Sequence, residues 1–117
     1  MSSLLQRRAE RERRSEADRA RVDLVRHLVA MALRVPLPEI DEGRTGAAVH
    51  ARQVAMYVAH TGFGLSLARV GAAFFRDRAT VAHACGRIEA QRDDPALDAL
   101  LLGLEHAVRN TPAGAFP

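Results

Sequence analysis

The sequence predicts an all-α protein of about five helices, built as one domain around a central helix-turn-helix. Three observations favour this fold class. Apolar residues recur at helical spacing in several segments, no segment alternates as β-strands do, and capping or breaking residues separate the helical segments. The 117 residues, 48% of them hydrophobic and 26% charged, suffice for one globular core.

The first predicted helix covers residues 7–34 and has two halves of different character. The first half is charged all round, and acid–Arg pairs at i,i+3 and i,i+4 spacing can support it as an exposed or frayed helix. Pro36 and Pro38 are expected to end the helix, and residues 41–46 to form a loop. The second half carries an apolar stripe that should dock on the core: Val22, Val25, Leu28, Val29, Ala32 and Leu33.

The middle of the chain is predicted to form three helices. The first covers residues 47–60 and is stopped by the segment 61–64, which contains two glycines. A short helix over residues 66–74 and a longer one over residues 78–91 follow, separated by a tight turn. Their order and lengths are typical of a helix-turn-helix.

Five residues shape this predicted helix-turn-helix. Ser66 is a natural N-cap for the short helix, and Asp77 occupies the N-cap position of the longer one. Phe75 and Arg76 lie between the two helices. Gly71, inside the short helix, indicates that the two helices approach closely.

The last predicted helix covers residues 96–109, after a break at Asp93, Asp94 and Pro95. Its apolar face consists of Leu97, Leu100, Leu101, Leu104 and Val108. The expected organisation is a charged N-terminal helical arm, the helix-turn-helix domain and a disordered tail, over residues 1–20, 21–110 and 111–117. The arm has three interpretations: a solvated or flexible extension, an arm that contacts the DNA backbone, or a segment that binds a protein partner or a second copy.

The composition excludes several functions. All 17 basic residues are Arg, so neither a P-loop NTPase nor Schiff-base chemistry can operate. The single cysteine, Cys85, excludes an internal disulfide and multi-cysteine zinc patterns. His83 and Cys85 lie two residues apart on a helix and do not face each other. We therefore expect no catalytic residues, no metal, no cofactor and no small-molecule substrate.

The distribution of charge favours a polyanionic partner. The net charge is +3, but residues 44–92 hold seven Arg against Asp77 and Glu89, which gives this block +5. No apolar run is long enough to cross a membrane. We expect a cytoplasmic, nucleoid-associated protein without a membrane partner.

The start of the second helix of a helix-turn-helix enters the major groove of DNA. Here Arg78 can pair with a guanine edge, Asp77 can accept from a cytosine amine, and the methyl groups of Ala79 and Thr80 can contact thymine. The surrounding arginines can neutralise phosphates: Arg69, Arg76, Arg87 and Arg92. The alternative is a packed helical corner in which Asp77 only caps and Arg78 is solvated.

Three linked motifs carry a resemblance to a known family. They are Arg-Gln-Val-Ala-Met at residues 52–56, Ser-Leu-x-x-Val-Gly-x-x-Phe at 66–74, and Arg-Asp-x-x-Thr-Val-x-x-Ala at 76–84. This pattern resembles the C-terminal DNA-binding domain of the bacterial replication initiator DnaA over about residues 20–108. The resemblance implies a Trp-repressor-like helix-turn-helix fold that binds double-stranded DNA, without the ATPase portion of that family.

The resemblance also implies roles for individual residues. Arg52 would enter the minor groove, and Asp77 would lie at the major-groove edge. Arg78 stands in place of a base-reading histidine, and Ala79 in place of a base-contacting threonine. The phosphate contacts would come from Ser66, Leu67, Ala68, Thr80 and Arg87. Independently of the resemblance, we expect His83 to be buried or beside the DNA. Phe75 replaces a glycine that is usual in the turn.

The function expected from these observations is sequence-specific DNA binding that regulates replication initiation or transcription without ATPase activity. The alternative is a protein-interaction module that retains the initiator scaffold and does not read DNA by itself. Its partner, or a second copy in a homodimer, would bind the N-terminal helix or the face from Leu97 to Val108.

Overall fold

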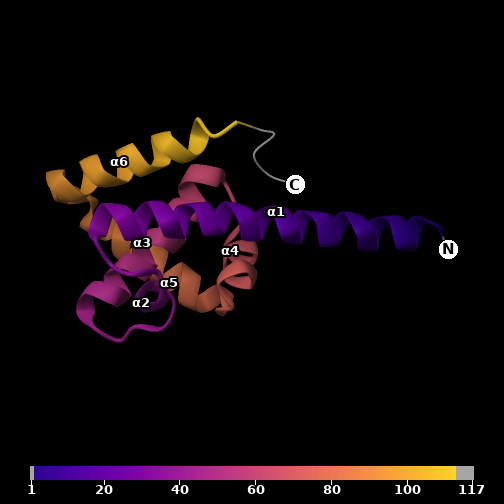
Figure 1. Ribbon diagram of the computed structural model, residues 1–117, viewed down its shortest axis with the longest axis horizontal. Coiled ribbons are helices and arrows are strands. Elements are labelled where there is room, and N and C mark those ends of the chain that lie inside the picture. The colour runs from indigo at the N-terminus through magenta and orange to yellow at the C-terminus, as the bar shows by residue number, and fades with distance from the viewer. Residues whose placement is uncertain (1, 113–117) are drawn as a thin grey trace.

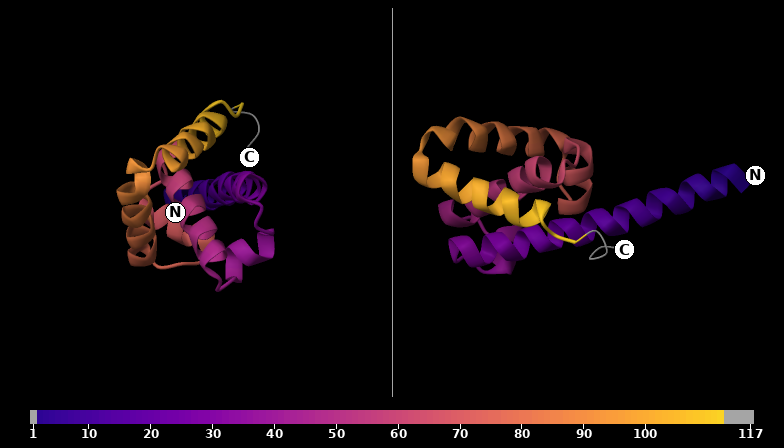
Figure 2. Two further views of the ribbon diagram at one scale, coloured as in Figure 1. Left: turned by 90° about the vertical axis from the view of Figure 1, so that its left-hand side faces the viewer. Right: turned by 90° about the horizontal axis from the view of Figure 1, so that it is seen from above.

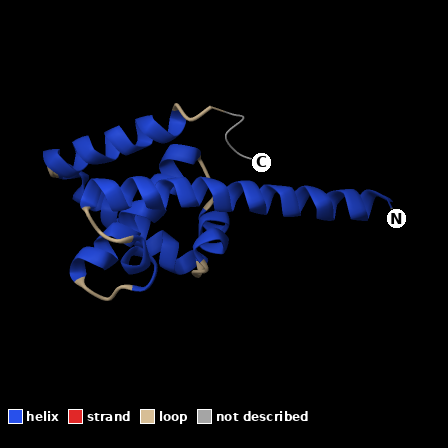
Figure 3. Cartoon of the chain, in the orientation of Figure 1, coloured by secondary structure: helices blue, strands red, loops and turns tan. Residues whose placement is uncertain are grey.

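The computed structural model describes residues 2–112, and the regular secondary structure of this part of the chain consists only of helices, which short loops connect (Figure 3). The prediction of an all-α fold is confirmed, with one α-helix more than expected. The helices are α1 (Ser2–Leu33), α2 (Leu37–Glu42), α3 (Gly46–Phe63), α4 (Leu67–Phe74), α5 (Arg78–Ala90) and α6 (Pro95–Arg109), with a 3-10 turn, η1, at Gln91–Asp93. Most of the predicted C-terminal tail, residues 113–117, lies outside the described residues.

Helix α1 is continuous from Ser2 and makes the molecule elongated, with extents of 52 × 28 × 25 Å. Its N-terminal half projects away from the other helices (Figures 1 and 2). Its second half packs through Val22, Val25 and Val29, as the apolar stripe predicted. Burial begins already at Ala17, inside the charged half of the helix.

Helix α2 was not predicted. The first helix ends at Leu33, before Pro36, as expected, but Pro36 is then the N-cap of α2. Pro38 lies in the first turn of α2, where a missing amide hydrogen costs nothing. The expectation of a loop over residues 41–46 therefore holds only for residues 43–45, because Asp41 and Glu42 belong to α2 and Gly46 begins α3. Ile40 is fully buried and fixes α2 to the core.

Helix α3 lies at the centre of the domain and contacts α1, α2, α4, α5 and α6. Its run of small and β-branched residues allows this close packing on several sides. Thr45 caps its start by accepting a hydrogen bond from the Ala48 amide at 3.2 Å. The helix continues through Phe63, three residues past the predicted end at residue 60, and its C-cap is Gly64, the last residue of the predicted stop, whose φ of +71° suits glycine.

Helix α6 packs its apolar face against α3 through Leu101, Leu104 and Val108. Asp94 caps this helix, accepting from the Ala96 amide at 3.3 Å. The core therefore uses most of the face that was considered for a protein partner.

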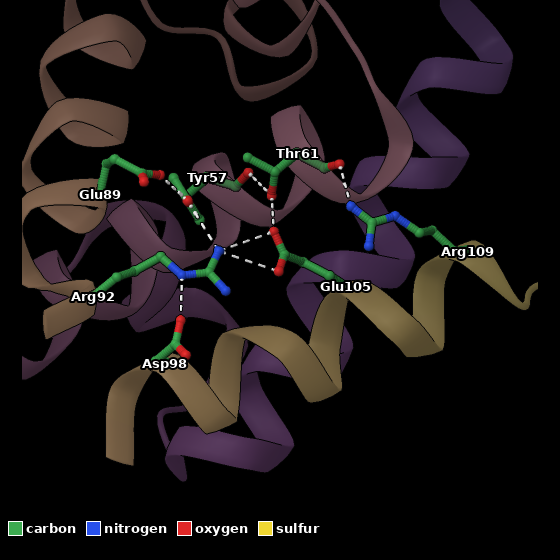
Figure 4. Close-up of polar contacts among 7 residues, drawn as sticks. All are labelled: Tyr57, Thr61, Glu89, Arg92, Asp98, Glu105 and Arg109. Atoms are coloured by element: carbon green, nitrogen blue, oxygen red, sulfur yellow. Dashed lines mark hydrogen bonds and ion pairs between the residues drawn. The ribbon is translucent and has the colours of Figure 1, made fainter. Parts of the chain in front are cut away.

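A polar network joins α3, α5, η1 and α6 (Figure 4). Arg92 donates to Asp98 at 2.6 Å, to the Tyr57 hydroxyl at 3.0 Å and to Glu105 at 3.2 Å. Tyr57 in turn donates to Glu89. Hydrogen bonding to Tyr57 and Asp98 raises the pKa of Arg92. The buried Glu105 carboxylate is thus fully paired, as a charge at such a position requires.

Candidate nucleic-acid interface

Helices α4 and α5 form the predicted helix-turn-helix. Ser66 caps α4 by accepting from the Arg69 amide at 3.2 Å, as expected. Asp77 occupies the N-cap position of α5, but its side chain makes no capping hydrogen bond. A Cβ on Gly71 would lie 2.6 Å from the Arg76 carbonyl oxygen. Gly71 is therefore needed because α4 touches the backbone of the turn itself.

The first turn of α5 is exposed on its outer side. Asp77, Arg78, Ala79 and Thr80 are all exposed, and Val81 begins the buried side of the helix. The buried face consists of Val81, Ala84, Cys85 and Ile88. One helix therefore has a packed face and a free face, which is the arrangement that groove insertion requires.

The free face continues along α5. His83 and Arg87 are exposed and lie three and seven residues after Thr80, so all three side chains share one side of the helix. Within the described residues, neither Arg78 nor Arg87 makes an ion pair or hydrogen bond through its guanidinium group. Both positive charges are available to an external anion.

Phe75 is an exposed apolar residue beside this face. Its side chain is 83% exposed, and its φ of +57° puts it in the left-handed region that favours glycine. The glycine that is usual in the family is absent here, and the exposure of the phenyl ring was not predicted from the sequence. A signal for the backbone conformation was available, because the residue after a helix end often adopts the left-handed conformation.

Two of the predicted contact arginines are held by α2. Arg52 donates to the carbonyl oxygens of Ile40 at 2.8 Å and Gly43 at 2.6 Å. Arg76 donates to the Asp41 carbonyl oxygen at 2.7 Å. These carbonyls belong to the last turn of α2 and to its C-cap, Gly43, where cations compensate for backbone acceptors that have no partner within the helix. Burial lowers the pKa of Arg52, and the nearby charge of Arg76 lowers it further.

Arg69 is held by the N-terminal helix. Its guanidinium donates two hydrogen bonds to Asp18, at 2.8 and 2.7 Å, and this bonding raises the pKa of Arg69. Asp18 is only 5% exposed and also accepts from Arg21 at 3.2 Å. This bidentate pair spans 51 residues of sequence and fixes α1 against α4. Sequence reasoning missed it because Asp18 lies among many similar charges.

The predicted site residues thus fall into two groups. The exposed group lies on α5 and at the start of α4: Ser66, Asp77, Arg78, Ala79, Thr80, His83 and Arg87. Leu67 is half-buried beside the Ser66 cap. The other group, Arg52, Arg69 and Arg76, is engaged within the fold. Arg92, which was expected near phosphates, is instead bound in the polar network of α6.

We also searched the described residues for a metal site, a reactive thiol and a membrane-spanning helix. Over the described residues, no group of three or more His, Cys, Asp and Glu side chains is placed to hold a metal ion. Burial raises the pKa of the Cys85 thiol to about 11, which keeps it protonated and unreactive near neutral pH. None of the described helices is both long and apolar enough to span a bilayer.

Comparison with known proteins identifies the helix-turn-helix. The family model for the bacterial dnaA protein helix-turn-helix matches residues 22–88. The chromosomal replication initiator protein DnaA of Thermomicrobium roseum is 39% identical over 85 residues. These residues cover 70% of this chain and 18% of that relative, so the chain spans less than a fifth of its length.

A solved structure supports the same assignment. A crystal structure described as a DNA replication initiation factor superimposes with a TM-score of 0.71 at 28% identity, covering 87% of this chain and 32% of that one. The matched residues 22–88 include α4, the turn after it and α5 as far as Ile88. The chain therefore belongs to the bacterial DnaA protein helix-turn-helix family.

Proposed function

We propose that this chain binds double-stranded DNA in a sequence-dependent manner, with the first turn of α5 in the major groove. It acts at the nucleoid by occupying sites that resemble or overlap those of the initiator, and so regulates replication initiation or transcription without catalysis. The observation that carries the proposal is the exposed first turn of α5, opposite a buried face, in a helix-turn-helix of this family.

Four residues of α5 and its cap would read the bases. Arg78 donates to a guanine edge, and Asp77 accepts from a cytosine amine, an assignment supported by the absence of a capping bond from its carboxylate. Ala79 and Thr80 offer methyl groups to thymine. Because Arg78 and Ala79 differ from the residues usual in the family, the preferred site should differ from the initiator box at the bases they face.

The phosphate contacts would come from both helices. At the start of α4, Ser66 satisfies the Arg69 amide, which leaves the amides of Leu67 and Ala68 for an external anion. Arg87 and His83 lie further along the exposed face of α5. The minor-groove role of Arg52 stays a prediction, since its guanidinium would have to leave the carbonyls of Ile40 and Gly43.

Fluorescence anisotropy at two salt concentrations tests the proposal. The duplexes are an initiator-type box, a scrambled box and a site enriched by selection from a random pool. We expect salt-steep binding, with the selected site preferred. Arg78→Ala should cost about 1 to 3 kcal/mol on the preferred site and little on the scrambled one. Arg87→Ala should weaken all duplexes alike and lower the salt slope by about 1.

Arg34→Gln is the matched control, because Arg34 is exposed at the opposite end of α1 from the projecting half. It removes one positive charge and should leave the sequence preference unchanged. The absence of binding at low salt would refute the DNA hypothesis and favour the interaction module. Homodimer formation stays a prediction; a second copy or tandem sites would raise the affinity of a chain with one recognition helix.

A further inference from the structure

The projecting half of α1 has no role in the packing of the domain. We define the projecting arm as residues 3–16, whose side chains are all exposed except the half-buried Ala9. Among the described residues, the one ion pair of this arm joins Arg8 to Glu12 at 3.4 Å. The arm accounts for much of the 52 Å length of the molecule (Figure 2). Because α1 is one continuous helix, the buried part of α1 fixes the direction in which each side chain of the arm points.

The orientation of the arm follows from the buried part of the same helix. Asp18 and Val25, seven residues apart, point from α1 into the domain, Asp18 toward α4 and Val25 into the core. Residues spaced by three, four and seven lie on one side of a helix. The stripe that continues this side into the arm consists of Leu4, Arg7, Arg11 and Arg14.

The acids of the arm lie off this stripe. At about 100° per residue, Glu10, Glu12 and Glu16 are turned about 80° or more from its centre. Arg11 and Arg14 form no ion pair within the described residues. A helix whose overall charge is mixed therefore presents a cationic side in the direction of the helix-turn-helix.

The stripe meets the helix-turn-helix at α4. Arg14 and Ser15 line a hollow together with Ala68, Arg69 and Ala72, and the Asp18–Arg69 pair fixes this register. At 1.5 Å per residue, Arg11 and Arg7 lie about 5 and 10 Å further along the arm. The arm thus leaves the domain beside the helix whose first turn is assigned to a phosphate.

We propose that Arg7, Arg11 and Arg14 contact the DNA backbone that flanks the site read by α5. The proposal rests on the proposed function and extends it. The stripe contains three guanidinium groups and one leucine, which suits phosphates and lacks the apolar repeat of a helix–helix seam. The arm of 14 residues is about 21 Å long, which corresponds to roughly six base pairs of duplex.

Two double variants of the full chain test this inference. Arg11→Gln with Arg14→Gln removes two charges from the stripe. Arg8→Gln with Arg13→Gln removes two charges from the other sides of the same helix and is the matched control. Each protein is titrated with a short duplex of about 10 base pairs and with one extended by about 10 base pairs on both sides. Circular dichroism verifies that each variant retains its helices.

We expect the stripe variant to lower the salt slope on the extended duplex by about 2, with a loss of about tenfold or more in affinity, and to change binding to the short duplex much less. Hydroxyl-radical footprinting should show loss of protection in the flank only. The control should lose clearly less affinity and keep the flank protected.

Three results would overturn the inference. Equal losses for the two double variants would mean general electrostatic attraction without a directed stripe. Unchanged DNA binding by the stripe variant would leave the proposed function standing without an arm contact, and loss of self-association in sedimentation would then assign the stripe to a second copy. If the unaltered chain binds neither duplex, the proposed function itself fails, and the inference fails with it.

Discussion

Replacing Gly71 by alanine would place a methyl group where the helix-turn-helix has no room for one. The new Cβ would lie 2.6 Å from the Arg76 carbonyl oxygen and 3.5 Å from the Arg78 nitrogen. Carbon and carbonyl oxygen normally stay at least about 3.3 Å apart, so the turn backbone would have to move by about 0.7 Å. Backbone cannot rotate away as a side chain can, and overpacking of this kind costs about 3 kcal/mol.

Alanine also favours the helix that contains it. The gain in helix propensity over glycine is about 1 kcal/mol, so the expected net loss in the free energy of unfolding is about 2 kcal/mol. For a domain of this size the loss corresponds to a fall in Tm of about 8 °C. Urea titration and thermal melts followed by circular dichroism measure both quantities.

Gly103→Ala is the matched control, because no atom lies within 4 Å of the Cβ that it would add in α6. Only the propensity term remains, so this variant should be more stable than the parent by up to about 1 kcal/mol. If Gly71→Ala were also stabilising, the contact between α4 and the turn would be looser than described, and the argument for a fixed α5 would fail.

Three further predictions concern charged and buried groups. Asp18→Asn removes the carboxylate held by Arg69 and should lower the free energy of unfolding in urea by about 1 to 2 kcal/mol, because the pair is only partly shielded from water. Arg92→Met leaves Glu105 buried without its cation and should cost about 3 kcal/mol in the same assay. Burial raises the pKa of Cys85 to about 11, so its neutral thiol favours the folded state below about pH 9, and this contribution is lost as the pH rises from 9 to 11.

Each of these has its own contradicting result. Asp23 is an exposed partner of Arg26. If Asp23→Asn lowered the free energy of unfolding as much as Asp18→Asn, the Asp18–Arg69 pair would have no special role in stability. Full stability of Arg92→Met would mean that Glu105 finds another partner. The free energy of unfolding of Cys85→Ala should fall less between pH 9 and 11 than that of the parent. Identical pH profiles for the two proteins would contradict the effect of burial.

The local signals in the sequence predicted most of the helices. Ser66 and Gly71 are each explained by their nearest neighbours along the chain, so their roles as cap and close contact could be predicted. The missed helix, α2, shows the limit of such rules. Pro36 was taken only as the end of the first helix, although proline is also favoured at the start of a helix. Only the burial of Ile40 in the core shows that a second helix begins after Pro36.

The candidate site was predictable only in part, for a physical reason. The exposed face of α5 follows from helical periodicity once Val81 and Ile88 are assigned to the core. The partners of Arg52 and Arg69 do not follow from helical periodicity. A long, flexible side chain can bond to any acceptor that the tertiary fold brings near it. Arg69 meets Asp18 across 51 residues, and no spacing rule connects them.

The most direct test of the proposed DNA-binding surface is residue-by-residue mapping of the complex. Backbone amide chemical shifts of the 15N-labelled chain would be followed by NMR during titration with the duplex enriched by selection. Binding through the helix-turn-helix predicts the largest changes at Leu67, Ala68 and residues 77–80, weaker ones at Arg87, and little change around Arg92 and α6. Changes centred on α6, or none at saturating DNA, would contradict it.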